Sequence, residues 1–120
     1  MLEIVYQLPY PPSVNHVYSR TRRGGVMLNP KARAYRDEVI KQIGKGHTTL
    51  KGPLSMQVDL YMPDKRKRDI DNPMKSLCDS LTHAKVYDDD SQIQRLLIQR
   101  IGIDAPGKAI VSIKQIHSGD

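Results

Sequence analysis

The chain has 120 residues, of which 38% are hydrophobic and 27% are charged. This length suits a single domain, and the composition is that of a globular protein rather than a disordered one. No apolar run approaches the roughly 20 residues that a membrane-spanning helix needs, so we expect neither a membrane segment nor a cleaved leader. The single cysteine, Cys78, excludes an internal disulfide and fits the reducing cytoplasm, where we expect the protein to work.

The charge is unevenly distributed along the chain. Lys and Arg number 19 against 13 Asp and Glu, a net charge of +6, which indicates a polyanionic partner such as nucleic acid. Most of the acidic residues fall between Asp59 and Asp90, directly beside a basic run. This juxtaposition suggests a metal site next to a phosphate site. The basic residues that we expect to contact phosphate are Arg20, Arg22, Arg23, Lys65, Arg66, Lys67 and Arg68.

The first half of the chain predicts one strand, one long loop and one helix. Residues 2–8 alternate in hydropathy, which is typical of a strand, and the prolines that follow must end it. Residues 13–28 are basic and rich in glycine, and we expect a loop there that has a function, because loops of this length are uncommon in compact domains. Asn29-Pro30 predicts a helix start, and Gly44 predicts its end.

The second half predicts three strands and a second helix. Residues 54–62 alternate without a break and give the clearest strand in the chain. A second Asn-Pro pair, Asn72-Pro73, predicts another helix with Asn72 as its cap. Residues 93–103 and 109–116 read as strands, and the turn residues between them predict a hairpin.

These elements predict one α+β domain spanning residues 1–120, in the order β-α-β-α-β-β. We expect a small mixed sheet with two helices packed on it. The last residues, 117–120, are expected to be flexible.

Acidic residues around the second helix predict a metal site. Asp69 and Asp71 are two residues apart, so in an extended backbone their carboxylates lie on the same side. Lys75 follows one helical turn later, and one of residues 88–90 can supply a third carboxylate. Mg²⁺ takes oxygen ligands and keeps substrate phosphates in its shell, and it supports phosphodiester cleavage. The alternative is that Asp69 and Asp71 only form a turn before the helix.

Several other residues have structural interpretations. The structural interpretation of the basic run is a solvated charged face, and that of Cys78 is a small residue of the core. The four histidines are scattered and lack zinc-ligand spacing; they are His16, His47, His83 and His117.

The segment Met62 to Asn72, which reads MPDKRKRDIDN, is followed by Lys75, by Asp79 and by Asp89-Asp90-Ser91-Gln92. Together with the opening Leu8 to Asn15 and with Ala34-Tyr35-Arg36-Asp37, it resembles the RusA family of Holliday-junction resolvases. The resemblance implies a homodimeric, Mg²⁺-dependent endonuclease, with Mn²⁺ as the alternative ion and no small-molecule cofactor. Its implied substrate is the four-way DNA junction, in recombination and repair, and such proteins are often carried by prophages.

The resemblance also assigns roles to particular residues. It implies that Asp69, Asp71 and Asp90 are the catalytic, metal-binding acids, and that Lys75 is an essential lysine. It places Asn15 near the active site, among the residues that contact DNA. Two other functions remain open: a non-catalytic DNA-binding module, such as a phage regulator, and a nuclease that acts on RNA.

Overall fold

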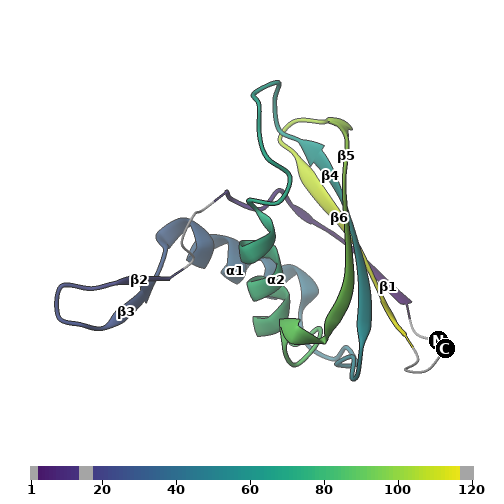
Figure 1. Cartoon of the computed structure of the whole chain (residues 1–120), viewed down its shortest axis with the longest axis horizontal. Helices are drawn as coiled ribbons and strands as arrows, with labels where there is room; N and C mark the ends of the chain where they lie inside the picture. The colour runs from purple at the N-terminus through teal and green to yellow at the C-terminus, as the bar shows by residue number, and fades with distance from the viewer. Residues whose placement is uncertain (1–2, 14–17, 117–120) are drawn as a thin grey trace.

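The computed structural model describes residues 3–13 and 18–116. Its main sheet contains four strands in the order β1-β6-β4-β5 (Figure 1). They are β1 (Glu3–Pro9), β4 (Leu54–Met62), β5 (Ile93–Ile103) and β6 (Lys108–Gln115). Strand β6 runs antiparallel to both of its neighbours, whereas β5 runs parallel to β4. The predicted α+β class with a mixed sheet is therefore confirmed.

Two helices, α1 (Pro30–Ile43) and α2 (Met74–His83), cover one face of this sheet (Figure 1). The core lies between the two layers, because alternate residues of β4 face the helices. The buried apolar residues of β4 are Leu54, Met56, Val58, Leu60 and Met62, and they meet Val39, Leu77 and Leu81 from the helices. Neither helix has the length and apolar character needed to cross a bilayer, within the residues described.

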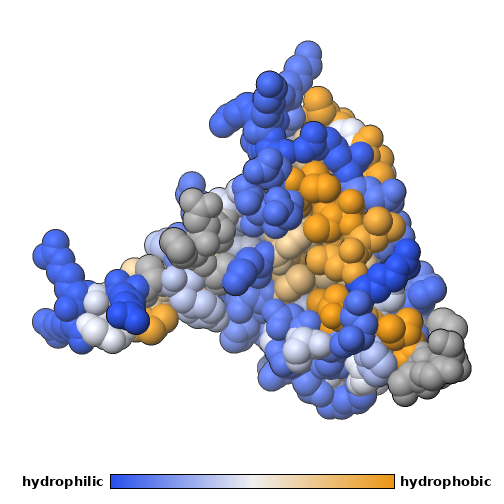
Figure 2. Space-filling view, viewed as in Figure 1, coloured by the Kyte–Doolittle hydropathy of each residue, from blue (hydrophilic) through white to orange (hydrophobic). Residues whose placement is uncertain are grey.

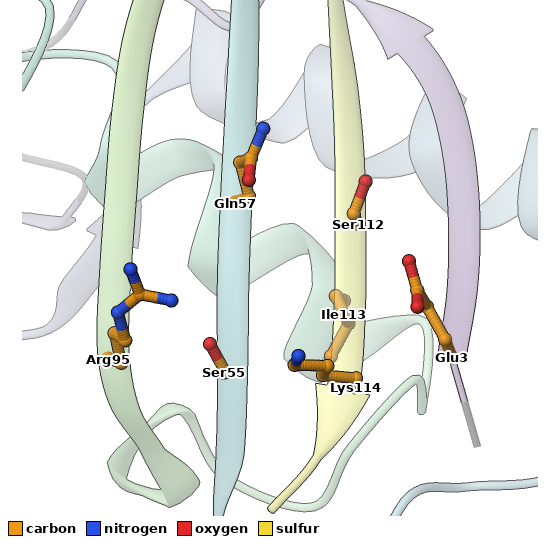
Figure 3. Close-up of a pocket in the computed structure, with 7 residues that line it drawn as sticks. All are labelled: Glu3, Ser55, Gln57, Arg95, Ser112, Ile113 and Lys114. Carbon is orange, nitrogen blue, oxygen red and sulfur yellow. The ribbon is translucent and has the colours of Figure 1, made fainter. Parts of the chain in front are cut away.

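The opposite face of the sheet carries no helix (Figure 1). A small pocket opens there, and Glu3, Gln57 and Arg95 are among its lining residues (Figure 3). None of the residues predicted to act in the site lines this pocket. The predicted functional residues that the structure describes lie instead at the end of the sheet, around the helices and on the hairpin of residues 18–28.

The predicted hairpin between residues 93–103 and 109–116 is wrong. Both segments are strands, but β4 lies between them. Helix α2 carries the chain from β4 to the parallel strand β5, and a short turn then crosses over to β6. Gly107 makes this turn feasible, because its φ is +94° and a Cβ there would lie only 3.0 Å from the Tyr10 Cβ. Each edge of the buried strand β4 thereby gains a hydrogen-bonded partner.

The basic segment predicted as a loop contains a second, separate sheet. Strands β2 (Tyr18–Arg20) and β3 (Val26–Leu28) pair antiparallel, and the hairpin projects away from the body of the protein (Figure 1). Its tip is closed by a hydrogen bond from the Thr21 amide to the Gly25 carbonyl, 2.8 Å long. The expected loop is thus corrected to a hairpin over residues 18–28.

Candidate active site

The segment that joins β4 to α2 begins with an ion pair. The Asp64 carboxylate accepts hydrogen bonds from the Arg66 amide at 2.9 Å and from the Arg68 guanidinium, whose Nη2 lies 3.1 Å away. These contacts, led by that of Arg68, hold the pKa of the Asp64 carboxyl well below its usual range. Arg68 is therefore partly neutralised, whereas Lys65, Arg66 and Lys67 are exposed.

Asp69 lies in an open pocket rimmed by cations. Lys67, Arg68 and Arg100 line this pocket together with Asn72 and Ser13. An anion can enter such a pocket where it contacts the cations, or where a metal ion lies between it and the carboxylate. The arrangement suits a phosphate group that lies beside a bound cation.

Sequence reasoning missed Arg100. It lies on β5 opposite Leu60, and its guanidinium Nη2 donates a hydrogen bond to the Arg68 carbonyl. The preceding residues on the same side of this strand, Leu96 and Ile98, are apolar. An arginine at the next position of that apolar series was the signal that could have identified it.

Helix α2 begins one residue later than predicted. Its N-cap is Pro73 rather than Asn72, and no side chain caps it. The first bond of the turn runs from the Met74 amide to the Asp71 carbonyl, 3.0 Å away. The Asp71 and Asn72 side chains are exposed beside the positive end of the helix, which favours anions there.

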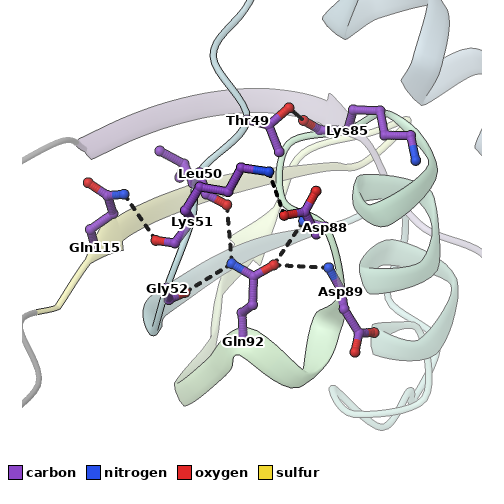
Figure 4. A network of polar contacts seen from close by, with 9 residues as sticks. All are labelled: Thr49, Leu50, Lys51, Gly52, Lys85, Asp88, Asp89, Gln92 and Gln115. Carbon is purple, nitrogen blue, oxygen red and sulfur yellow. Dashed lines mark hydrogen bonds and ion pairs between the residues drawn. The ribbon is translucent and has the colours of Figure 1, made fainter.

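The three consecutive aspartates after α2 have different surroundings. The turn is locked by Gln92, whose side-chain oxygen accepts from the amides of Asp88 at 2.8 Å and Asp89 at 3.0 Å (Figure 4). Lys51 pairs with the Asp88 carboxylate at 2.7 Å, and the Ser91 hydroxyl donates to that of Asp89. Two of the three carboxylates are therefore held by neighbours in the turn or across the surface.

Asp90 instead faces α2. Burial, followed by the negative charges of Asp89 and Asp79, raises the pKa of the Asp90 carboxyl, and the Lys75 ammonium partly offsets this rise. The positive charge of Lys75 is therefore part of the electrostatic surroundings of Asp90. The choice of Asp90 that the family resemblance implies stays a prediction.

The predicted metal ligands are not gathered at one point in the single chain. Among residues 3–13 and 18–116, no three His, Cys, Asp or Glu side chains form a group able to hold a metal ion. Asp69 belongs to the cationic pocket, and Asp90 lies beside Lys75 and Asp79. As hard oxygen donors, the carboxylates suit Mg²⁺ chemically. Their assignment as metal ligands stays a prediction.

The predicted DNA-contacting residues fall on two surfaces. Arg20, Arg22 and Arg23 are exposed on the hairpin, whose tip is hydrophilic in Figure 2. The basic run at 65–68 leads into the pocket of Asp69. Asn15 lies outside the described residues, so its predicted role is untested.

The fold and the pocket define a small α+β domain with a cationic site suited to nucleic-acid phosphate. Residues 9–114 match the model of a family described as endodeoxyribonuclease RusA. A crossover junction endodeoxyribonuclease of Enterobacteria phage HK97 is 37% identical over 98% of this chain and 99% of its own length. Those of Enterobacteria phage 82 and Escherichia coli K12 are 34% and 32% identical, each over 91% of this chain and 92% of the relative. The chain belongs to the RusA family.

Proposed function

We propose that this protein is an endonuclease that cleaves four-way DNA junctions. The relatives carry the name crossover junction endodeoxyribonuclease, and the match spans most of both chains. The observation that carries the proposal is the pocket in which Lys67, Arg68 and Arg100 surround Asp69. Such a pocket suits a phosphodiester, because cations bind the phosphate oxygens and a carboxylate is available for a metal ion.

The proposed chemistry requires Mg²⁺, or Mn²⁺ in its place. We assign its binding to Asp69, Asp71 and Asp90, which would have to come closer together than in the described structure to share one ion. A bound divalent ion would activate water and stabilise the leaving oxygen. Lys75 contributes a positive charge near Asp90, and we assign it the role of stabilising negative charge on the phosphate. The positive end of the α2 dipole favours anions in the same region.

Binding along the flanking DNA is assigned to two basic surfaces. One is the exposed run of Lys65, Arg66 and Lys67, and the other is the arginine-bearing hairpin. Contacts of this kind position the backbone and make the affinity depend on salt. Together these surfaces would contact a longer stretch of DNA than the pocket alone.

We also propose that two copies act together. A four-way junction is resolved by symmetric nicks in two strands, which two sites related by a two-fold axis can make. In support, β5 is an edge strand, and the apolar surface in Figure 2 extends over it. The exposed aliphatic residues of β5, with the fraction of each that is exposed, are Leu96 (41%), Leu97 (38%), Ile101 (47%) and Ile103 (57%). Such an edge is a common place for association.

The oligomeric state can be measured by light scattering after gel filtration. We expect a dimer, and we expect Leu97→Glu to shift it toward monomer. Ile40→Glu, at an aliphatic residue of α1 that is 38% exposed, is the control and leaves the dimer intact. A monomer at the concentrations that support cleavage contradicts this part of the proposal.

The activity itself is tested with a synthetic four-way junction and a linear duplex of the same sequence. With Mg²⁺ we expect paired, symmetric nicks in the junction and little cutting of the duplex, and EDTA abolishes both. Equal cutting of the two substrates would reject junction selectivity. Binding without cutting would favour the non-catalytic DNA-binding alternative, and preferred cutting of structured RNA would favour the RNA nuclease.

The roles in recombination and repair, the prophage origin and the cytoplasmic location remain predictions. The roles in recombination and repair follow from the proposed substrate, since DNA junctions arise during recombination. The prophage origin follows from the family resemblance, and the cytoplasmic location from the single cysteine.

A further inference from the structure

Asp79 joins three parts of the molecule from the second turn of α2. Its Oδ1 accepts a hydrogen bond from the Tyr18 hydroxyl of the hairpin at 3.2 Å. Its Oδ2 lies 3.8 Å from the Arg36 guanidinium of α1, and its Oδ1 lies 3.6 Å from the His83 Nε2. The side chains of Asp79 and Arg36 are only 22% and 19% exposed, so their interaction is less screened by water than a surface ion pair.

The hairpin is a small element, and contacts at its base connect it to the body. It is not paired with the main sheet, and each of its strands has three residues. Its buried residue is Leu28, which packs with Ala32 of α1, whereas Tyr18 and Val26 are 48% and 69% exposed. An isolated two-stranded hairpin is at best marginally stable in water, so contacts at its base determine where its tip points.

The same carboxylate also lies on the side of α2 that faces the candidate active site. Asp79 follows Lys75 by four residues, which places the two side chains as neighbours on one helical face. The negative charge of Asp79 is felt by Asp90, as is the positive charge of Lys75. One side chain therefore contacts the hairpin and borders the proposed catalytic residues.

We propose that Asp79 is a positioning residue: through Tyr18 it fixes the hairpin so that its arginines bind the DNA backbone while the cut strand lies at Lys75 and Asp90. The inference rests on the proposed function, because it takes DNA as the partner of the hairpin. Asp79 itself contacts no phosphate, since its negative charge would repel one. Its contribution to affinity is the orientation of Arg22 and Arg23.

The test compares a variant that lacks the hydrogen bond from the hairpin to Asp79 with a variant that lacks two positive charges of the hairpin. Junction binding is measured by fluorescence anisotropy in EDTA over a series of salt concentrations. Tyr18→Phe removes one hydrogen bond, so we expect about three- to tenfold weaker binding. The slope of affinity against salt should stay unchanged, because no cation is lost. The double variant Arg22→Ala, Arg23→Ala should bind more weakly and also lower that slope by about 2.

Two further variants separate positioning from folding. Asp79→Ala should bind the junction as weakly as Tyr18→Phe, whereas Asp79→Asn keeps an acceptor oxygen for Tyr18 and should recover most of the affinity. Tyr61→Phe removes a hydroxyl from the sheet face away from the helices and is the matched control. At saturating protein, single-turnover cleavage by Tyr18→Phe should stay within about twofold of the parent.

The decisive measurement combines Tyr18→Phe with the double arginine variant. If Tyr18 acts by orienting the arginines, adding Tyr18→Phe to the double arginine variant should cause no further loss. Full additivity, or unchanged binding by Tyr18→Phe, overturns the inference. Because binding is measured without metal, a protein that shows this coupling but never cuts refutes the proposed nuclease and leaves the positioning role intact. A protein that binds no junction refutes both.

Discussion

The two Asn-Pro pairs of this protein have the same sequence and different structural roles. At the first, the Asn29 side chain accepts hydrogen bonds from the amides of Lys31 at 2.9 Å and Ala32 at 3.4 Å, and Pro30 is the first residue of α1. At the second, Pro73 itself is the cap of α2, and no side chain caps that helix. Asn72 instead lines the pocket of Asp69.

This difference shows how a helix start can serve either stability or chemistry. The start of α1 satisfies its own amides, which stabilises the helix. No side chain caps the start of α2, so its positive end and its polar residues are available to a ligand. A missing cap beside acidic and basic residues is therefore a signal for a binding site.

The largest expected effect is on the α2 side of this comparison. Asp71→Asn should reduce junction cleavage by about a thousandfold or more, because it removes a proposed metal ligand. Binding should be retained or improved, since a negative charge near phosphates is lost. Gel-based cleavage and anisotropy measure the two quantities separately. Asp37→Asn, on the exposed side of α1, should change neither, and joint loss of binding and cutting in Asp71→Asn would contradict the metal assignment.

A matched pair of alanine variants tests the comparison directly. Asn29→Ala should lower the free energy of unfolding by about 1 kcal/mol and leave cleavage by the folded protein unchanged. Asn72→Ala should do the reverse: about tenfold slower cleavage with an unchanged unfolding midpoint. Thermal denaturation and single-turnover rates provide the readouts. Equal loss of stability in both variants would mean that Asn72 also supports its helix.

A smaller effect is expected where the basic run meets the pocket. Asp64→Asn releases the Arg68 guanidinium, so we expect about threefold tighter junction binding. The slope of affinity against salt should become steeper by about 1, as one more cation contacts phosphate. Salt titrations of the variant and the parent measure both. Weaker binding would show instead that Asp64 holds Arg68 in its binding orientation.

The smallest effect concerns Cys78, on the side of α2 toward Asp90. Burial, with a contribution from the charge of Asp90, raises the pKa of the Cys78 thiol to about 11. At pH 8 only about one thiol in a thousand is then ionised, so the folded protein should react slowly with a disulfide reagent. The reaction should become fast in denaturant. Rapid modification of the folded protein would show that this flank of α2 is open to solvent.

The sequence predicted the local features of the fold well. The start of α1 at Asn29-Pro30, the alternation of β4 and the presence of β5 and β6 are all confirmed. Each depends on residues close together in the chain. Their spacing determines which face is buried, and capping residues determine where a helix begins. The hairpin at residues 18–28 was missed because its strands are short and its side chains are mostly exposed, which leaves little hydrophobic pattern to detect.

The candidate site was predictable in part. The acidic and basic residues of 65–71 stand next to each other in the chain, and their motif also carries the family resemblance. Arg100 was not predicted, because it joins the pocket only through the pairing of β5 with β4. The surroundings of Asp88 and Asp90 also came from tertiary contacts, with Lys51 and with α2, whereas Asp89 contacts its near neighbour Ser91.

By itself, the sequence determined the positions of both helices and of the four strands of the main sheet, the basic character of the chain and the resemblance to the RusA family. The tertiary structure alone decided that β4 separates β5 from β6, that Arg100 reaches the pocket and that Asp79 holds the base of the hairpin. The physical reason is the range of the interactions. Periodicity and capping depend on neighbours a few residues apart, whereas strand order and long-range contacts depend on how complete elements pack together.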